Sequence, residues 1–450
     1  MTVHLADPAL PGAGAVWRPD QSRHLLMNTV ASQITLYTDA SSRIDGPVEP
    51  GPALHEWARG VAAAGEGSGE EAWVLAEARR LGPDAYPTRA FYGRYLHDCF
   101  RRVVAGAPAH VTVRVHRSRA VALTDAHGTA GGPQTLQLAD GTRLDGLDAV
   151  VLALGHVPAR PTAAEARTAG LARLHGLAHF APANPADADL SGVAPGSTVL
   201  LRGLGLNFFD YMALFTTGRG GMFRRTGDGR LVYRSSGREP RLCAFSRRGV
   251  PYHARGENQK GPSGRYLPRL LTPARIAALR ARGPVSFTAD LWPLIAAEVE
   301  GVYYGTLLTA LGRDAERAEF TARYLAAGAS GEREELLDTY GVPAGRRWDW
   351  ERIAAPYKGR DFTGRDAFRR WLLDRLRADV RAGARGQCGR AAEGRPRRAA
   401  RPAQRGPVRG RPRRARRRLP PRRAGALVHA AQTPSCPSAR RPAGSRRWPP

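Results

Sequence analysis

The sequence contains few cysteines and no long apolar run. Its four cysteines lie far apart and form no CxxC pair: Cys99, Cys243, Cys388 and Cys436. That spacing argues against a zinc site or a disulfide framework and fits a reducing cytoplasm. No apolar run reaches the roughly 18 residues of a transmembrane helix, and no signal sequence opens the chain. We therefore expect a cytoplasmic protein with no metal site and no membrane partner.

Several catalytic motifs are also missing. The sequence has no HExxH motif, no P-loop, no pattern that indicates a Ser/His/Asp triad and no internal repeat. These absences argue against zinc metalloproteases, P-loop nucleotide hydrolases and solenoid repeat proteins.

Acidic residues are scarce only in the C-terminal region, residues 381–450. The 450-residue chain has a formal net charge of +29, and residues 381–450 hold 21 Arg, no Lys, no Asp and only Glu393, a net +20. Residues 1–380 hold 48 basic and 39 acidic residues, as an ordinary globular protein does. They are numerous enough to form two or three domains with sizeable cores.

The basic tail has two interpretations. Its Arg, Pro, Ala and Gly residues have GC-rich codons, as expected when a GC-rich gene is read out of frame, and a shift of one base over residues 387–407 can encode an amphipathic helix. We favour a frameshifted tail. The alternative is a genuine disordered, Arg-rich tail that would make the chain a basic nucleic-acid-binding protein.

Under either interpretation, clustered arginines bind polyanions through counterion release. The tail has one aromatic residue, Trp448, and no Asn, so it offers little for base stacking or adenine recognition. We therefore expect non-specific polyanion binding and no specific nucleic-acid partner.

The first half of the body alternates between strand and helix patterns. The predicted elements are a short strand through Val3 and Leu5 that ends on Asp7, helices at 70–82 and 88–106, strand at 110–125, a hairpin at 134–146 and a buried parallel strand at 148–156. The hairpin rests on the turn dipeptide Asp140-Gly141. The last strand, DAVVLALGH, rests on its continuous apolar run.

The second half begins with a Pro/Ala/Asp-rich linker at 157–195. Strand, glycine turn and helix are predicted over 197–221, short strands and loops over 222–260, and helices from 265 to 380. On the last of these helices, we predict that a stripe of four residues forms core: Phe368, Trp371, Leu372 and Leu376.

The stretch RGLGLNFFD (202–210) carries the sharpest local signal. Gly203 permits a tight turn after a strand, and Gly205 lets the backbone approach a phosphate at a helix N-terminus. Phe208 stands where a dinucleotide fingerprint has its third glycine, so a plain strand-to-helix turn is the alternative. Asn207 at the helix start is a further candidate contact, and Arg224 with Arg225 could meet a 2′-phosphate.

Polar side chains also gather among the apolar residues of MNTVASQITLYTD (27–39). Asn28, Thr29, Ser32 and Gln33 could hydrogen-bond the polar edge of a flavin ring, or could satisfy loop backbone instead. At the end of the predicted strand 148–156, Gly155 could pack against a bound cofactor.

Together these stretches resemble the actinobacterial FAD/NAD(P)-binding protein family, distant relatives of flavin-dependent N-hydroxylating monooxygenases. The resemblance rests on HLLMNTVASQITLYTD, YPTRAFYGRYL, DAVVLALGH, RGLGLNFFDYMALFTTGRGG, SGREP and SRRGVPYHARG, which occur in this order over residues 1–380. It implies an α/β protein with two Rossmann-like dinucleotide-binding folds, a β-hairpin insertion and a helical region.

The resemblance also implies cofactors and site residues. FAD and NAD(P)H would carry the redox chemistry of an NAD(P)H-using oxidoreductase, with an unknown small-molecule substrate. Asp7 matches the acid that binds the FAD ribose, and Asn28, Thr29 and Gln33 match the flavin-side segment. Gly155 matches the end of an FAD-domain strand, and Gly203 with Gly205 the second nucleotide turn.

The domain boundaries follow from this assignment. Residues 1–190 would form the FAD half, 191–264 the NAD(P) half, 265–380 the helical region and 381–450 the disordered tail.

The family begins with a strand, a GxGxxG loop and a helix, and this chain starts at the strand that follows them. We favour a start codon placed too late over a truncation, and under either interpretation we expect the chain as written to bind FAD weakly or not at all. In the extreme case the chain is a defective fragment without activity.

Overall fold

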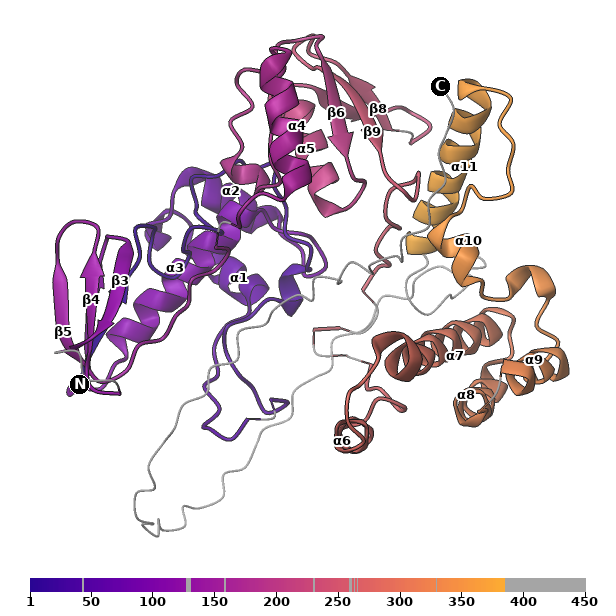
Figure 1. Ribbon diagram of the computed structural model, residues 1–450, viewed down its shortest axis with the longest axis horizontal. Helices are drawn as coiled ribbons and strands as arrows, with labels where there is room; N and C mark the ends of the chain where they lie inside the picture. Colours follow the sequence, from indigo (N-terminus) through magenta and orange to yellow (C-terminus); the bar gives the residue numbers. More distant parts are fainter. Residues whose placement is uncertain are drawn as a thin grey trace. The chain divides into compact units, whose positions relative to one another are not determined.

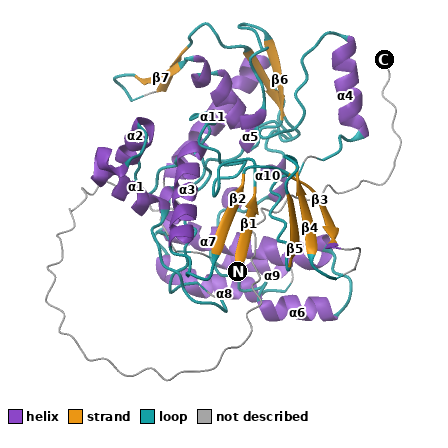
Figure 2. Ribbon diagram, turned by 90° about the vertical axis from the view of Figure 1, so that its left-hand side faces the viewer, coloured by secondary structure: helices purple, strands orange, loops and turns teal. Residues whose placement is uncertain are grey.

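The computed structural model describes residues 1–384, apart from 43, 127–130, 158, 230, 259–260, 263, 265 and 329. The chain is a mixed α/β protein with small sheets (Figures 1 and 2). The predicted disordered tail lies outside the described residues from 385 onward. Helix α11 (Arg365–Ala384) continues past the predicted boundary at 381.

Three helices lie in sequence between the two strands of the first parallel pair. Strand β1 (Thr2–Ala6) pairs in parallel with β2 (Thr112–His116), and the chain between them forms α1 (Leu54–Ala64), α2 (Ala72–Arg80) and α3 (Arg89–Ala105). These elements confirm the predicted strand through Val3 and Leu5, which ends one residue before Asp7, and both predicted helices. The predicted strand at 110–125 is split into β2 and β3.

The three helices share one apolar core. Leu54, Val74, Phe91 and Tyr95 are fully buried there, and each such side chain contributes about 1.5–3 kcal/mol by burial. Thr88 starts α3 by accepting a hydrogen bond from the Phe91 amide at 3.1 Å, a helix N-cap.

An antiparallel three-stranded sheet follows, in the order β3 (Ala120–Asp125), β4 (Gln134–Leu138) and β5 (Arg143–Leu147). The β4–β5 turn holds Gly141 at a φ of 88°, a conformation that glycine adopts without strain. This sheet confirms the predicted hairpin.

The predicted buried strand at 148–156 is wrong. The segment is irregular, and Val151, Leu152 and Leu154 are 81%, 64% and 63% exposed. A strand buried on both faces needs a hydrogen-bonded neighbour and covering layers, and among the described residues no sheet includes this segment.

The predicted linker at 157–195 contains a helix, α4 (Ala163–Leu174). Thr162 and Glu165 form a reciprocal capping box, with the Thr162 amide donating to Glu165 Oε2 at 2.7 Å. The T-x-x-E spacing was a readable signal for this helix start.

The second parallel pair follows the same plan as the first. Strand β6 (Thr198–Arg202) leads through a glycine turn into α5 (Leu206–Phe215), and β9 (Arg241–Phe245) then pairs with β6 in parallel. The hairpin of β7 (Met222–Arg225) and β8 (Leu231–Arg234) lies between α5 and β9 in the chain.

The described region after residue 265 is mainly helical, as predicted, and its helices are α6 (Pro273–Ala281), α7 (Trp292–Ala310), α8 (Arg317–Ala326), α9 (Ser330–Thr339), α10 (Trp350–Ala354) and α11. Tyr304, Leu308, Phe320, Tyr324 and Leu337 form an aromatic-rich core among α7–α9. The four residues of the predicted stripe on α11 are half-buried.

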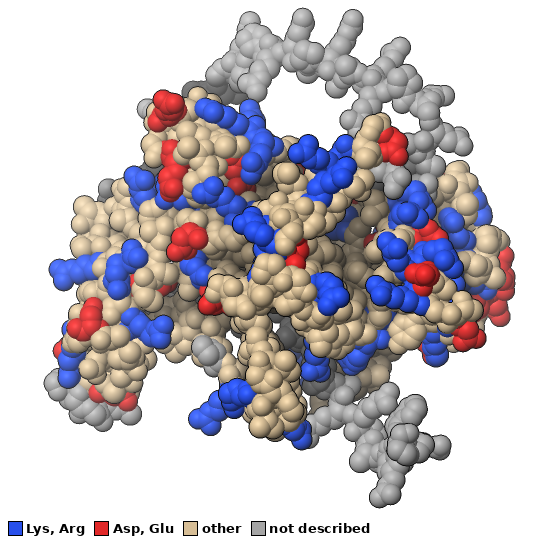
Figure 3. Space-filling model, turned by 90° about the horizontal axis from the view of Figure 1, so that it is seen from above, with Lys and Arg blue, Asp and Glu red and all other residues tan. Residues whose placement is uncertain are grey.

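Among the described residues, none of the helices combines the length and apolar character needed to cross a membrane. Cys99 and Cys243 are free thiols, and Cys388 and Cys436 lie outside the described residues. Basic side chains are scattered over the face seen in Figure 3, with acidic side chains between them.

Candidate functional site

The turn between β6 and α5 has the geometry that the sequence predicts. Gly203 has a φ of 108°, and its amide donates to the Phe245 carbonyl at 2.8 Å. Gly205 precedes the first turn of α5, and no side chain caps that turn. The amides at the start of α5 are therefore available to an anionic ligand.

The segment that follows β9, residues 246–258, contacts this turn, and we call it the strap. The Tyr252 amide donates to the Leu204 carbonyl at 3.3 Å. The Tyr252 ring lies against Gly205, where a Cβ atom would be 3.3 Å from Cε2. Gly205 has no side chain, and the Tyr252 ring of the strap packs against it here.

The strap also contacts the predicted flavin-side segment. Arg255 donates to the carbonyl of Asn28, and Gln33 Nε2 donates to Asn258 Oδ1 at 3.3 Å. Asn258 Nδ2 in turn donates to Asp84 Oδ1 at 2.9 Å. The strap therefore contacts both the glycine turn and two of the predicted flavin-side residues, although these parts lie far apart in the sequence.

Helix α11 holds the strap on another side. His253 Nδ1 lies 2.7 Å from Asp379 Oδ1, and the Ala254 amide donates to Asp379 Oδ2 at 2.6 Å. The Glu257 amide donates to the Gly383 carbonyl at 3.0 Å. Asp379 thereby fixes the backbone of the strap between Tyr252 and Arg255.

A buried ion pair joins helix α3, which follows β1 in the chain, to helix α5, which follows β6. Arg89 at the start of α3 reaches Asp210 of α5 with an Nη2–Oδ2 distance of 2.6 Å, and the two side chains are 17% and 11% exposed. Arg89 Nε also donates to the Leu26 carbonyl at 3.2 Å. Burial and the charge of Asp210 raise the pKa of the neighbouring phenol of Tyr211.

The loop after β1 holds the predicted ribose-binding acid. The Asp7 amide continues the strand pairing by donating to the His116 carbonyl at 3.0 Å. Asp7 Oδ1 accepts from the Ala9 amide at 2.8 Å, which orients the half-buried carboxylate.

The motif YPTRAFYGRYL is largely a packing motif. A Cβ atom at Gly93 would lie 1.8 Å from the Trp17 carbonyl oxygen, so the loop after β1 crosses α3 where the helix has no side chain. This agrees with the interpretation of the motif as helix packing.

The other predicted site residues lie apart from the strap contacts. Thr29 Oγ1 donates to Asn28 Oδ1 at 3.4 Å. Asn207 is exposed in the first turn of α5, and Arg224 is exposed on β7 opposite Val232. Gly155 has a φ of 62° in the irregular segment after β5.

Sequence reasoning missed the residues that join these parts. Tyr252, His253, Arg255 and Asn258 lie in or beside SRRGVPYHARG, where the only signal was a high density of Arg and Gly. Asp379, the partner of His253, lies more than 120 residues further along, and no local pattern reveals such a contact.

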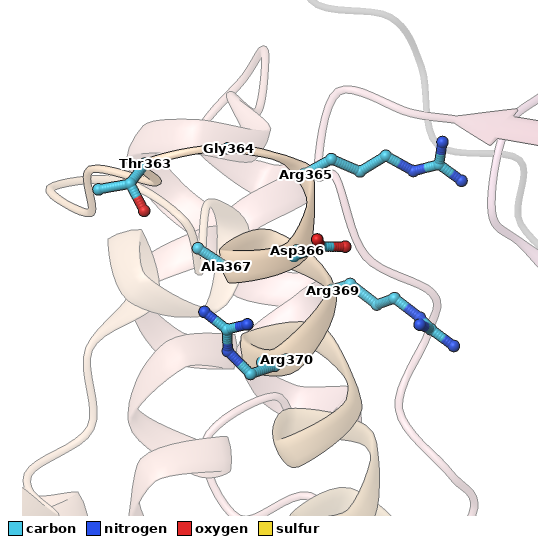
Figure 4. Close-up of a pocket in the computed structure, with 7 residues that line it drawn as sticks. All are labelled: Thr363, Gly364, Arg365, Asp366, Ala367, Arg369 and Arg370. Carbon is cyan, nitrogen blue, oxygen red and sulfur yellow. The ribbon is translucent and has the colours of Figure 1, made fainter.

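Two cavities lie away from the predicted site residues. One, of about 720 Å³, opens at the start of α11, where Arg365 and Arg369 extend from the helix (Figure 4). The other, of about 550 Å³, is lined by the segment 185–195 and by residues near the end of α5, Arg219 among them. Neither contains a residue predicted to bind a cofactor.

Comparison with known proteins identifies the N-terminal region. Residues 1–157 match the FAD-NAD(P)-binding family. The match supports the predicted resemblance to FAD/NAD(P)-binding proteins over β1–β5 and α1–α3. The matched residues include the first parallel strand pair and the loops that hold Asp7, Asn28, Thr29 and Gln33.

Three curated relatives extend the similarity over 386–390 residues, and each covers 84–85% of this chain. Proteins named L-aspartate N-monooxygenase (nitrosuccinate-forming) from Streptomyces cremeus and Streptomyces davaonensis are 62% and 59% identical. Nitrosuccinic acid synthase npaA from Aspergillus oryzae is 49% identical, so the similarity reaches beyond actinobacteria. The aligned region spans 56–59% of the length of these relatives.

Proposed function

We propose that the chain is a flavin-dependent L-aspartate N-monooxygenase that forms nitrosuccinate, with FAD and NAD(P)H as cofactors. The observation that carries the proposal is the 62% identity over 390 residues with a protein named for that activity. The strap contacts support it, because they bring the second nucleotide turn and the flavin-side segment to one connecting segment.

The residues present fit the pyrophosphate of one dinucleotide and the ribose of a second. The uncapped start of α5 behind Gly203 and Gly205 suits a pyrophosphate. Asp7 follows a parallel strand, where a carboxylate can accept hydrogen bonds from ribose hydroxyls. When bound, the nicotinamide would supply a hydride and the flavin would supply oxygen chemistry.

The roles of the chain's own side chains are binding and orientation. Asn28, Thr29 and Gln33 would hydrogen-bond the polar edge of the flavin ring, and Arg255 and Asn258 would hold that segment in position through the contacts described above. Gly155 and Asn207 would make further cofactor contacts. Arg224 is the sequence-based candidate for a 2′-phosphate.

The experiment is an assay of the full chain with excess FAD, NADPH and each of L-aspartate, D-aspartate and L-glutamate. We expect nitrosuccinate, detected by mass spectrometry, from L-aspartate alone. A Gly205→Val variant serves as the matched control, because it should lose product while retaining its circular dichroism spectrum. Conversion of another amine in preference to L-aspartate, or no oxidation of any of them, would contradict the proposal.

A further inference from the structure

In the helical region, one carboxylate is shared by a tryptophan and a tyrosine. Glu300 of α7 accepts a hydrogen bond from Trp350 Nε1 at 2.5 Å through Oε1, and one from Tyr324 Oη at 2.9 Å through Oε2. Trp350 begins α10 and Tyr324 lies in α8, two helices that Figure 1 labels beside α7 in the chain order. Indole and phenol rings are among the side chains most readily oxidised by one electron. Glu300 therefore joins two redox-active rings.

Tyr324 lies where it can lose an electron only together with its phenolic proton. The side chain is 3% exposed, and the Arg333 guanidinium lies 5.6 Å from the ring centroid. A buried ring cation beside this positive charge is costly, whereas a neutral phenoxyl radical is not. Burial raises the pKa of the Tyr324 phenol, and its hydrogen bond to Glu300 raises it further. Glu300 is the acceptor for the phenolic proton, at a distance that suits proton transfer.

Tryptophan rings connect this pair with solvent. Trp292 is 36% exposed, and its ring centroid lies 4.9 Å from that of Trp350. Trp348 stacks on the Trp350 ring at 5.2 Å, but its buried Nε1 has no hydrogen-bond partner among the described residues. An oxidised indole becomes acidic at its N–H group, so a carboxylate contact stabilises the neutral radical. Glu300 gives Trp350 that contact.

We propose that Trp350, Glu300 and Tyr324 form a proton-coupled redox relay. The relay takes up one-electron oxidations that small oxidising radicals cause at Trp292, and it places them on Tyr324. This activity is separate from the proposed monooxygenase reaction and requires no nucleotide.

The relay has two steps. In the first, the oxidising radical takes one electron from Trp350 by way of Trp292 and becomes an anion, and the Nε1 proton moves to Glu300. In the second, Tyr324 gives one electron to the Trp350 radical. Glu300 returns its proton to Nε1 through Oε1 and accepts the phenolic proton at Oε2. The products are the anion, a Tyr324 phenoxyl radical and a protonated Glu300. The second step is downhill, because a neutral phenoxyl radical forms at a lower potential than a neutral indolyl radical.

The test is pulse radiolysis of the full chain with azide radicals, which oxidise indoles in preference to phenols. We expect the indolyl absorption to convert into the phenoxyl absorption at a rate that does not depend on protein concentration and that falls in D2O. A rate that rises with protein concentration would show a reaction between molecules. An equal rate in D2O would show electron transfer without the proton. Either result would overturn the proposal.

Two conservative variants address the relay itself. Glu300→Gln keeps the size of the side chain but removes the proton acceptor, so it should slow the conversion about tenfold or more. Tyr324→Phe should remove the phenoxyl absorption of this phase. Circular dichroism checks that each variant retains the fold, and if one does not, the other still decides.

Tyr266→Phe is the matched control. Tyr266 Oη donates to Glu298, a buried carboxylate on the same helix, whose other donors are the Arg269 and Leu270 amides and not an indole. The variant should leave the conversion unchanged, and a loss equal to that in Tyr324→Phe would overturn the proposal. So would a slower conversion in Trp348→Phe without one in Glu300→Gln, because the oxidation would then travel through the stacked rings and not through the shared carboxylate.

Discussion

Arg89 Nη2 lies 2.6 Å from Asp210 Oδ2 and ties helix α3 of the first parallel unit to helix α5 of the second. Both side chains are largely buried, so each compensates the desolvation of the other. The pair gives a structural role to Arg89, which begins α3 within the motif YPTRAFYGRYL, and to the aspartate that ends the turn motif RGLGLNFFD.

Removing one side chain of the Arg89–Asp210 pair should lower the stability of the folded protein. We expect Arg89→Met to lower the free energy of unfolding by about 2–3 kcal/mol, because Asp210 would remain buried without its cation. The double variant Arg89→Met/Asp210→Asn should recover part of that loss. Chemical denaturation of the single and double variants measures the coupling, and strictly additive losses would show that the two residues do not interact.

Gly205 should tolerate no branched side chain under the proposal that the β6–α5 turn binds a nucleotide. Gly205→Val should lower the affinity for NADP⁺ at least tenfold without unfolding the chain, because the added atoms would occupy the approach to the helix start. Since a Cβ there also meets Tyr252, the control is the double variant with Tyr252→Ala. Recovery of affinity in the double variant would assign the effect to the tyrosine ring and not to the pyrophosphate.

Glu239 should make stability depend on acid pH. It accepts from Ser235 Oγ, Tyr233 Oη and the Ser236 amide, and these bonds hold its pKa well below the ordinary 4.5. A carboxylate with a lowered folded pKa contributes its full stabilisation above the unfolded pKa, and that contribution declines as pH falls from the unfolded pKa through the folded pKa. Glu239→Gln should therefore lower Tm more at pH 7 than near pH 3.

The control for this prediction is Glu66→Gln, a change at an exposed glutamate in the turn Gly65–Ser68. It should shift Tm equally little at both values of pH. A Glu239→Gln deficit that is as large at pH 3 as at pH 7 would rule out the carboxylate charge as its source.

Asp379 should control the mobility of the strap. Asp379→Ala removes the acceptor of the Ala254 amide, and we expect hydrogen exchange of that amide to accelerate by more than tenfold. Asp374→Ala, on the same helix but in an exposed pair with Arg377, is the control. Unchanged protection at Ala254 would mean that other contacts hold the strap.

Local patterns predicted most of the elements. The turn dipeptide Asp140-Gly141, the spacing around Gly203 and Gly205, and the apolar periodicity of α3 each depend on neighbours within a few residues, and all three predictions are confirmed. The prediction of a strand at 148–156 failed because an apolar run indicates only that burial is favourable. Whether such a segment joins a sheet depends on strands elsewhere in the chain.

The site was less predictable than the fold, for the same reason. Asn28 and Gln33 were selected from their polar side chains in an apolar stretch, and the structure places strap residues on both. Their partners Arg255 and Asn258 lie about 225 residues further along. An Arg/Gly-rich stretch contains no local information about which distant backbone it will contact.

The parallel pairing of β1 with β2 has a consequence for synthesis on the ribosome. Thr2 pairs with Thr112, so β1 leaves the ribosome about 110 residues before its partner strand. At typical elongation rates, that delay is roughly 5–20 s. The core of α1–α3 lies wholly within the intervening residues and can assemble during the wait, so the nascent helices bring the two strands together. Until then the unpaired edge of β1 is exposed to pairing with other nascent chains, and chaperone dependence should be concentrated in that interval.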